Sequence, residues 1–206
     1  MKLTQLLFKN RELIIKGVDE IEDFTNANLV LGYGTKSLIA DEKLYNDLAS
    51  RYPHAEIVLC STAGEISGKL VYENTVAITA VEFEKTKIKS AVVNLASHHN
   101  SYEAGKFLVE QFDTEDLTYI LVFSDGLLAN GSHLVKGMED GNAGNVPITG
   151  GMAGDGTNFN FTLVGLNGPP ENGKLVAIGF YGKDLVVKFR SEERRVGKEC
   201  LRLCRS

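Results

Sequence analysis

The chain has 206 residues, of which 43% are hydrophobic and 24% charged, and its formal net charge is −5. These values are typical of a globular domain, and the lack of a basic stripe in the first 190 residues argues against nucleic-acid partners. Because no stretch approaches the roughly 20 apolar residues of a membrane helix, we expect a cytosolic protein without a membrane partner.

Charge and cysteine are unevenly distributed along the chain. Residues 191–206 hold five basic and three acidic residues, so residues 1–190 carry a net charge of −7. Cys200 and Cys204 lie in this last segment, whereas Cys60 stands alone in the body. No disulfide framework follows from this distribution.

The first half of the body alternates between strand and helix patterns. Apolar runs predict buried strands at 28–31 and 57–60, and helical spacing of apolar residues predicts a helix over 37–51. Two longer strands, over 75–83 and 88–95, are separated by a short charged segment. They predict an antiparallel hairpin.

The second half continues the alternation. A helix is expected over 101–112, with Ser101 as N-cap candidate and Phe107 on its apolar side. A buried strand at 119–123 precedes a second helix over 131–139, which carries Val135 on its apolar side. Three consecutive antiparallel strands are expected at the end, over 161–166, 175–181 and 185–189.

The sum of these elements is an α/β fold, a mixed β-sheet sandwich with helices between strands and glycine-rich loops at the strand ends. Four glycine-bearing turns each follow an apolar strand. Ligands in open α/β sheets bind beyond the carboxyl ends of strands, where glycine lets backbone N–H groups approach a carboxylate or phosphate. We expect the turns to line one pocket, with tight-turn geometry alone as the alternative. The candidate ligand-binding residues are Gly32, Gly34, Ser61, Thr62, Gly64, Glu65, Ser124, Asp125, Gly126, Gly150, Gly151, Gly154 and Asp155.

Nucleotide and metal motifs fit this sequence poorly. The Gly32-Tyr33-Gly34 turn starts like a dinucleotide fingerprint, but Ser37 stands where the third glycine belongs. The Gly68-Lys69 pair lacks the spacing of a phosphate-binding loop, and the four histidines lack metal-ligand spacing. We therefore predict neither a cofactor nor a metal.

Acidic residues in the glycine turns allow two interpretations. Glu65, Asp125 and Asp155 either cap turns and helices or recognise an ammonium group, which with amide donors would suit an amino-acid-like zwitterion. An enzymatic alternative uses Cys60 or Ser61 as nucleophile, with Asp125 or Asp155 as acid or base. No nucleophile–base pair is recognisable in the sequence, and a lone cysteine on an apolar strand is usually a core residue.

Three of these turns together resemble the N-terminal part of the FIST family. The resemblance rests on Cys60-Ser61-Thr62-Ala63-Gly64-Glu65-Ile66, Phe123-Ser124-Asp125-Gly126 and Gly150-Gly151-Met152-Ala153-Gly154-Asp155. It implies a sensory domain of signal-transduction proteins, prokaryotic and some eukaryotic, that binds small molecules such as amino acids and has no established catalytic residues. It also implies partners in the form of a signalling output domain and a C-terminal FIST half.

The end of the chain departs from the family pattern. The segment 191–206, SEERRVGKECLRLCRS, is similar to read-through of sequencing-adapter sequence. We therefore predict a FIST N-like sensory domain over 1–190 and a non-native tail over 191–206, with a native basic tail as the alternative.

The leading functional prediction is a cytosolic sensory domain that binds a small polar metabolite, an amino acid or a relative of one, through its glycine-rich loops. A small-molecule enzyme is the rival, and a scaffold that docks partners through a sheet edge is a third reading.

Overall fold

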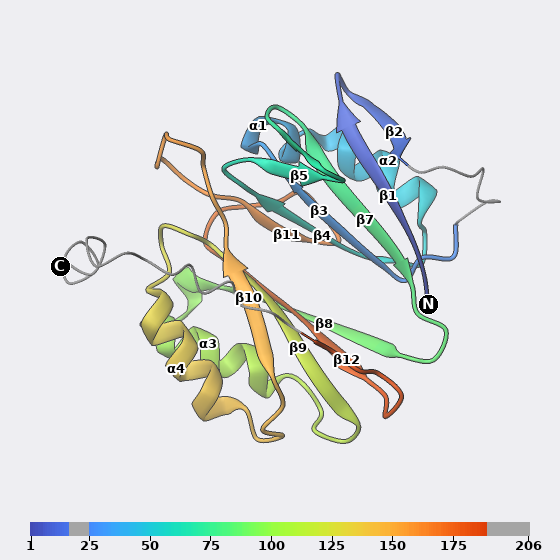
Figure 1. Cartoon of the computed structure of the whole chain (residues 1–206). Helices are drawn as coiled ribbons and strands as arrows, with labels where there is room; N and C mark the ends of the chain where they lie inside the picture. The colour runs from blue at the N-terminus through green and yellow to red at the C-terminus, as the bar shows by residue number, and fades with distance from the viewer. Residues whose placement is uncertain (17–24, 189–206) are drawn as a thin grey trace, which may run out of the picture.

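The computed structural model describes residues 1–16 and 25–188, which form four layers: two β-sheets face to face, each with helices on its outer face (Figure 1). The six-stranded sheet has the order β11-β4-β3-β7-β1-β2. Its strands are β1 (Lys2–Lys9), β2 (Glu12–Lys16), β3 (Leu29–Gly34), β4 (Glu56–Ser61), β7 (Val76–Glu82) and β11 (Val164–Leu166).

The second sheet has four strands in the order β10-β9-β12-β8. These strands are β8 (Lys87–Asn94), β9 (Leu117–Ser124), β10 (Ile148–Met152) and β12 (Lys174–Tyr181). A small separate hairpin is formed by β5 (Glu65–Ser67) and β6 (Leu70–Tyr72). The helices are α1 (Lys36–Ile39), α2 (Glu42–Arg51), α3 (Ser101–Glu110) and α4 (Gly131–Gly141), with a short 3-10 turn, η1 (Leu95–Ser97).

Alternating side chains on the strands build three cores. On β4, Ile57 and Leu59 face α1 and α2, whereas Val58 and Cys60 face the other sheet. The side chains of β12 alternate in the same way in the second sheet, where Leu175 faces α3 and α4. The predicted mixed α/β sandwich is therefore confirmed, and both sheets bury both of their faces.

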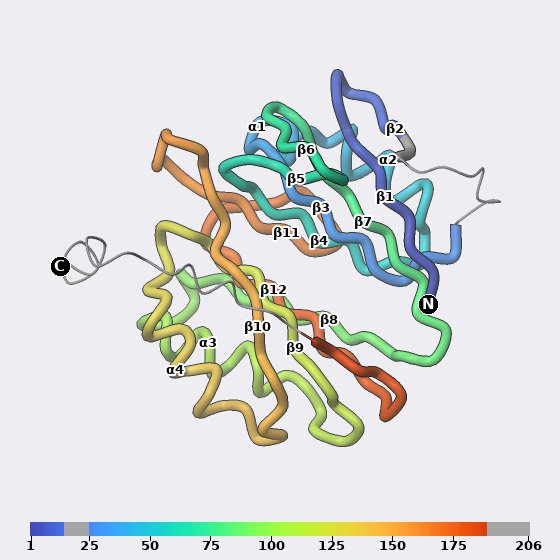
Figure 2. The backbone as a smooth tube through the Cα atoms, viewed as in Figure 1, coloured from blue at the N-terminus to red at the C-terminus, as the bar shows by residue number. Residues whose placement is uncertain are grey.

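The predicted hairpin of 75–83 and 88–95 is wrong. Strand β7 pairs with β1 and β3 in the first sheet, whereas β8 pairs with β12 in the second. Figure 2 shows the chain leaving one layer after β7 and entering the other at β8. Each strand finds its partners far away in sequence, so the short linker crosses between sheets rather than closing a turn.

The helix predicted over 37–51 is two helices. Its break lies at Asp41, whose side chain accepts a hydrogen bond from the backbone N–H of Lys43 and caps α2. At α3 the N-cap is Asn100, which accepts from the N–H of Glu103, and not Ser101. Ser101 instead accepts a hydrogen bond from the N–H of Asn130.

Two apolar residues predicted to face the core are half-exposed. Phe107 on α3 and Val135 on α4 are both 50% exposed. The predicted run of antiparallel strands at the end is also wrong, because β11 pairs with β4 and β12 lies between β8 and β9. Residues 185–188 form no strand, and residue 189 lies outside the described residues. The β1–β2 hairpin had no counterpart among the predictions.

Candidate functional site

Glu65 is the most buried acidic residue at the carboxyl end of β4. The turn that follows β4 leads into β5, whose first residue is Glu65, and only 2% of Glu65 is exposed. Its Oε1 accepts hydrogen bonds from the hydroxyls of Thr62 at 3.0 Å and Thr35 at 3.3 Å, and its Oε2 accepts from Thr75 at 3.0 Å. Neutral hydroxyls thus hold this carboxylate, with no ion pair to it among the described residues.

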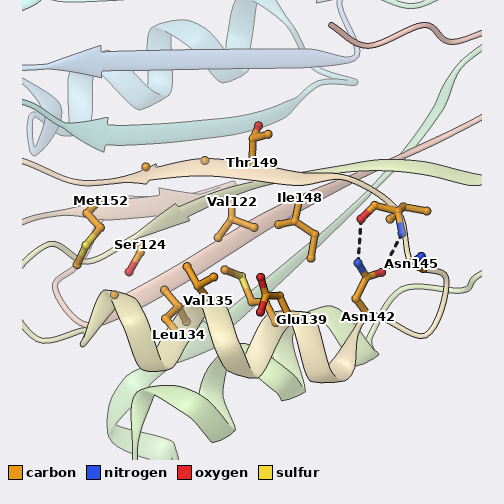
Figure 3. Close-up of a pocket in the computed structure, with 15 residues that line it drawn as sticks. Val122, Ser124, Leu134, Val135, Glu139, Asn142, Asn145, Ile148, Thr149 and Met152 are labelled. Atoms are coloured by element: carbon orange, nitrogen blue, oxygen red, sulfur yellow. Dashed lines mark hydrogen bonds between the residues drawn. The ribbon is translucent and has the colours of Figure 1, made fainter. Parts of the chain in front are cut away.

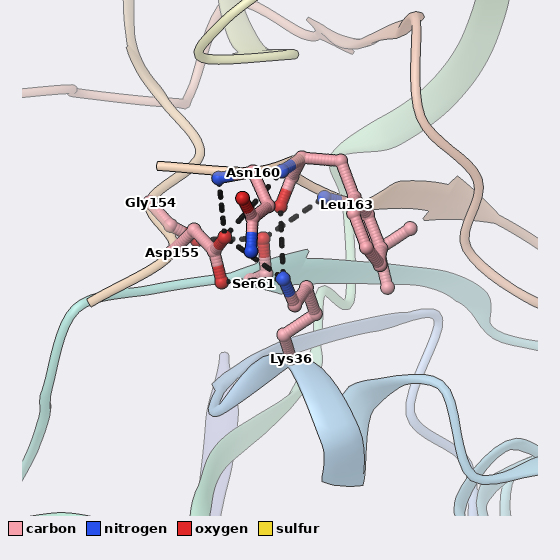
Figure 4. Close-up of polar contacts among 7 residues, drawn as sticks. Lys36, Ser61, Gly154, Asp155, Asn160 and Leu163 are labelled. Carbon is pink, nitrogen blue, oxygen red and sulfur yellow. Dashed lines mark hydrogen bonds and ion pairs between the residues drawn. The ribbon is translucent and has the colours of Figure 1, made fainter. Parts of the chain in front are cut away.

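Lys36, at the start of α1, and Asp155, in the turn after β10, form an ion pair near Glu65 in the lining of one cavity. The Nζ of Lys36 lies 2.7 Å from Oδ1 and 2.8 Å from Oδ2 of Asp155, and also 3.7 Å from the centre of the Phe161 ring (Figure 4). The hydrogen bond from Lys36, helped by the backbone N–H groups of Asn160 and Phe161, lowers the pKa of Asp155 from its usual value.

Ser61 fastens the segment 153–163 to the end of β4. Its hydroxyl donates to the carbonyl of Gly154 at 2.8 Å and accepts from the N–H of Leu163 at 2.9 Å (Figure 4). Gly154 passes so close that a Cβ there would lie 3.0 Å from the backbone nitrogen of Ala63. This contact holds the turn after β10 against the turn after β4.

A polar cavity of about 420 Å³ opens between these turns. Lys36 is the only basic residue of this lining in the part of the chain that the structure describes, and Glu65, Glu73 and Asp155 supply carboxylates. Hydroxyls and amides complete the lining, among them Thr35, Ser37, Thr62, Asn74, Thr157 and Asn158. A cavity that presents both signs of charge beside neutral donors is suited to a zwitterion.

A second cavity of about 450 Å³ adjoins the polar one and lies between the two sheets. Thr62 and Ala63 line both cavities. Apolar and small residues form most of the second lining, namely Tyr33, Phe123, Leu121, Cys60, Gly150, Gly151 and Gly154. We call the two cavities the polar cavity and the interlayer cavity.

Burial raises the pKa values of two side chains that line the interlayer cavity, Cys60 and Tyr33. The pKa of the Cys60 thiol is raised to about 12 by burial, and the pKa of Tyr33 is raised above its usual value by burial first and then by the nearby Cys60 and Tyr119. Cys60 is therefore a neutral thiol near pH 7. Its sulfur lies 3.5 Å from the carbonyl oxygen of Ser61. Among the described residues, no basic side chain forms a hydrogen bond with this sulfur.

In the turn after β9, the side chain of Asp125 binds backbone N–H groups. Asp125 is 1% exposed; its Oδ1 accepts from the N–H groups of Leu127 and Leu128, and its Oδ2 accepts from Gly173. The N–H of Gly126 donates to Thr162. Asp125 therefore makes a turn and binds its backbone, as one of the two sequence interpretations had it.

Eight of the thirteen candidate residues line the two adjoining cavities: Ser61, Thr62, Gly64, Glu65, Gly150, Gly151, Gly154 and Asp155. Ser124 lies elsewhere, on an apolar groove beside α4. Gly32, Gly34, Asp125 and Gly126 line none of these. A Cβ at Gly32 would lie 2.7 Å from the Leu59 side chain and one at Gly34 2.6 Å from the Thr75 carbonyl oxygen, so sheet packing explains both glycines.

Sequence reasoning missed Lys36, Thr35 and Thr75. Lys36 and Thr35 directly follow the glycines of the first turn, so the same strand-end rule that selected Gly34 would have reached them. Thr75 offers no such signal, because it precedes β7 and meets Glu65 only through the fold.

The comparison with known proteins identifies the family. The model of the FIST N domain matches residues 28–198, so the chain belongs to the FIST family, whose domains have a sensory role in signal transduction. No curated protein matches the sequence. The match extends past residue 190, while residues 191–206 lie outside the described residues, so the non-native tail stays a prediction.

Two further findings concern membrane helices and metal sites. Every helix in the described residues falls short of the length and apolarity needed to cross a bilayer. Over the same residues, no three His, Cys, Asp or Glu side chains gather closely enough to hold a metal ion. The cytosolic location stays a prediction.

Proposed function

We propose that this FIST domain senses a small zwitterionic metabolite, an amino acid, in the polar cavity. The observation that carries the proposal is that one cavity is lined by Glu65, a buried carboxylate held by hydroxyls, and by Lys36, the one basic lining residue among those described. An ammonium group beside Glu65 would gain a charged partner, and a carboxylate would meet Lys36.

The side chain of such a ligand would point to the interlayer cavity. That cavity shares Thr62 and Ala63 with the polar one and offers the rings of Tyr33 and Phe123. Apolar or aromatic amino acids would bury more surface there than small polar ones. Occupancy would then be passed to a signalling output domain or protein.

A thermal-shift screen of the twenty amino acids on the full chain tests the proposal. A ligand at a hundred times its Kd stabilises the folded state by about 2.7 kcal/mol, a readily measured rise in Tm. Glu65→Gln and Lys36→Met should each abolish the rise. Lys43→Met is the matched control, because Lys43 forms only an exposed pair with Asp47 on α2. Absence of any shift with a folded protein, or a shift kept in both cavity variants, would count against the site.

The rival function, catalysis by Cys60 or Ser61, has weaker support. Ser61 is fully buried and its hydroxyl is engaged by Gly154 and Leu163, and the thiol of Cys60 is neutral. Asp155 is paired with Lys36, and Asp125 with backbone N–H groups. Iodoacetamide labelling at pH 7.5 separates the two functions: a Cys60 more reactive than free cysteine would favour an enzyme, and an unreactive one the sensor.

A further inference from the structure

Among the described residues, strand β10 forms an edge of the four-stranded sheet with no strand beyond it. It lies outermost in the order β10-β9-β12-β8 and contains no charged residue and no proline in Ile148–Met152. The other edges are guarded: β8 carries Lys87 and Lys89, β2 begins with the charged Glu12, and β11 has only three residues. Proteins use charges and short strands to block unwanted pairing at an edge, so β10 stands out as available for pairing.

The hydrogen-bond pattern shows which groups of β10 bond to β9 and which face away from it. The carbonyl of Pro147 accepts from Ile120, and the N–H of Ala153 donates to the carbonyl of Ser124, so odd-numbered residues bond to β9. In a parallel ladder the residues between them point the other way. The N–H and C=O groups of Ile148, Gly150 and Met152 therefore face outward along the edge.

A hollow lies on each face of this edge. On one face, a groove of about 600 Å³ runs between β10 and α4, lined by Val135, Leu134, Met138, Ile148 and Met152 among others; we call it the α4 groove. On the opposite face lies the interlayer cavity, which shares Thr149, Gly150, Gly151 and Met152 with the groove. In Figure 3, Ile148 and Met152 point toward α4, and Thr149 points away from it.

Gly151 has no packing reason to be glycine. A Cβ there would meet no atom within 4 Å, whereas one at Gly150 would lie 2.0 Å from the carbonyl oxygen of Val122. Glycine weakens a strand, and a bulge, a tight bend or the close approach of a ligand or another backbone is its usual reason there. The approaching chain would come to the exposed half of β10.

The α4 groove contains a single charged lining residue, Glu139, which has no ion pair among the described residues. We propose that the β10 edge and the α4 groove bind an extended segment of a partner protein, which adds to the sheet as a fifth strand. Alternate side chains of the segment enter the α4 groove, and a Lys or Arg of the segment pairs with Glu139.

A second copy of the chain fits the edge less well. The segment it would add is its own β10, which offers no basic side chain to Glu139. Charge complementarity therefore selects a partner segment with apolar residues at alternate positions and one basic residue, rather than self-pairing.

The test selects nine-residue peptides from a displayed random library on the full chain and measures the most enriched sequence by fluorescence anisotropy. We expect enrichment of an apolar, alternating pattern with a Lys or Arg. Gly151→Lys, which guards the edge, and Val135→Asp, which charges the groove, should each weaken binding about tenfold or more. Phe107→Asp is the matched control, a helix residue with the same 50% exposure on α3, and should change Kd less than twofold.

Charge reversal sharpens the test. Glu139→Lys should enrich acidic in place of basic peptides, at an unchanged Tm. The proposal is overturned if no sequence is enriched, or if the enriched peptide binds Gly151→Lys and Val135→Asp as tightly as the parent. It is also overturned if light scattering shows a dimer that Gly151→Lys converts to a monomer, because a second copy would then be the occupant.

Discussion

The neighbouring parallel strands β9 and β10 are each followed by a turn with an aspartate next to a glycine, Asp125 and Asp155. The two carboxylates differ in the groups that they bind. Both carboxylate oxygens of Asp125 accept hydrogen bonds from nearby backbone N–H groups, three in all. Asp155 shares its oxygens between the N–H of Asn160 and a lysine from another layer, at the wall of the polar cavity. Asp125 is thus held by backbone donors alone, whereas Asp155 is held in part by the side chain of Lys36, which also lines the polar cavity.

Asp125→Ala should have the largest effect on stability. It leaves three N–H groups without an acceptor in a region where Asp125 itself is 1% exposed, which costs about 3–5 kcal/mol of the free energy of unfolding. Asp125→Asn keeps one acceptor oxygen and should recover part of the loss. Urea denaturation measures both. The matched control is Asp113→Ala, whose exposed pair with Lys89 should contribute little. Equal losses for Asp125→Ala and the control would disprove the structural role.

Gly126→Ala comes next. A Cβ at Gly126 would lie 1.9 Å from the carbonyl oxygen of Ala153, so the two turns must move apart, at a cost of about 2–3 kcal/mol. The same measurement in urea detects this cost. A loss below 0.5 kcal/mol, by the usual range of surface substitutions, would mean that the two turns are not packed together as described.

The contrast between the two turns also shows which features of the structure can be predicted from the sequence. Apolar runs and helical spacing predicted the mixed α/β sandwich, because a run such as 57–60 is local information in the sequence. The strand pairing was not predicted, since β7 and β8 look like a hairpin until their distant partners β1 and β12 are known. Likewise, Asp125 and Asp155 have similar local sequences, and only the fold brings Lys36, 119 residues away, to the second of them.

Asp155→Asn should have a smaller effect, and one that depends on pH. The partly buried pair with Lys36 contributes about 1 kcal/mol near neutral pH. Because the folded-state pKa of Asp155 is lowered, its contribution is fully present above the unfolded pKa of about 4 and is lost as pH falls through the folded value.

The difference in unfolding free energy between the parent and Asp155→Asn should therefore be constant from pH 7 to about 5 and shrink below about 4. Urea denaturation across this range measures it. A difference that grows on acidification would reverse the sign and show that the protonated form of Asp155 is the one the fold favours.

Gly151→Ala should have the smallest effect, and in the opposite direction. Its Cβ meets no atom within 4 Å, and Gly151 is not among the residues of positive φ, so alanine fits the native strand. Alanine also restricts the unfolded chain, which should stabilise the protein by about 0.4–1 kcal/mol. Thermal unfolding measures the rise in Tm against Gly126→Ala, the glycine with no room for a Cβ. A destabilised Gly151→Ala protein would mean that β10 is held by contacts the described residues do not make, and the edge would then not be free for a partner strand.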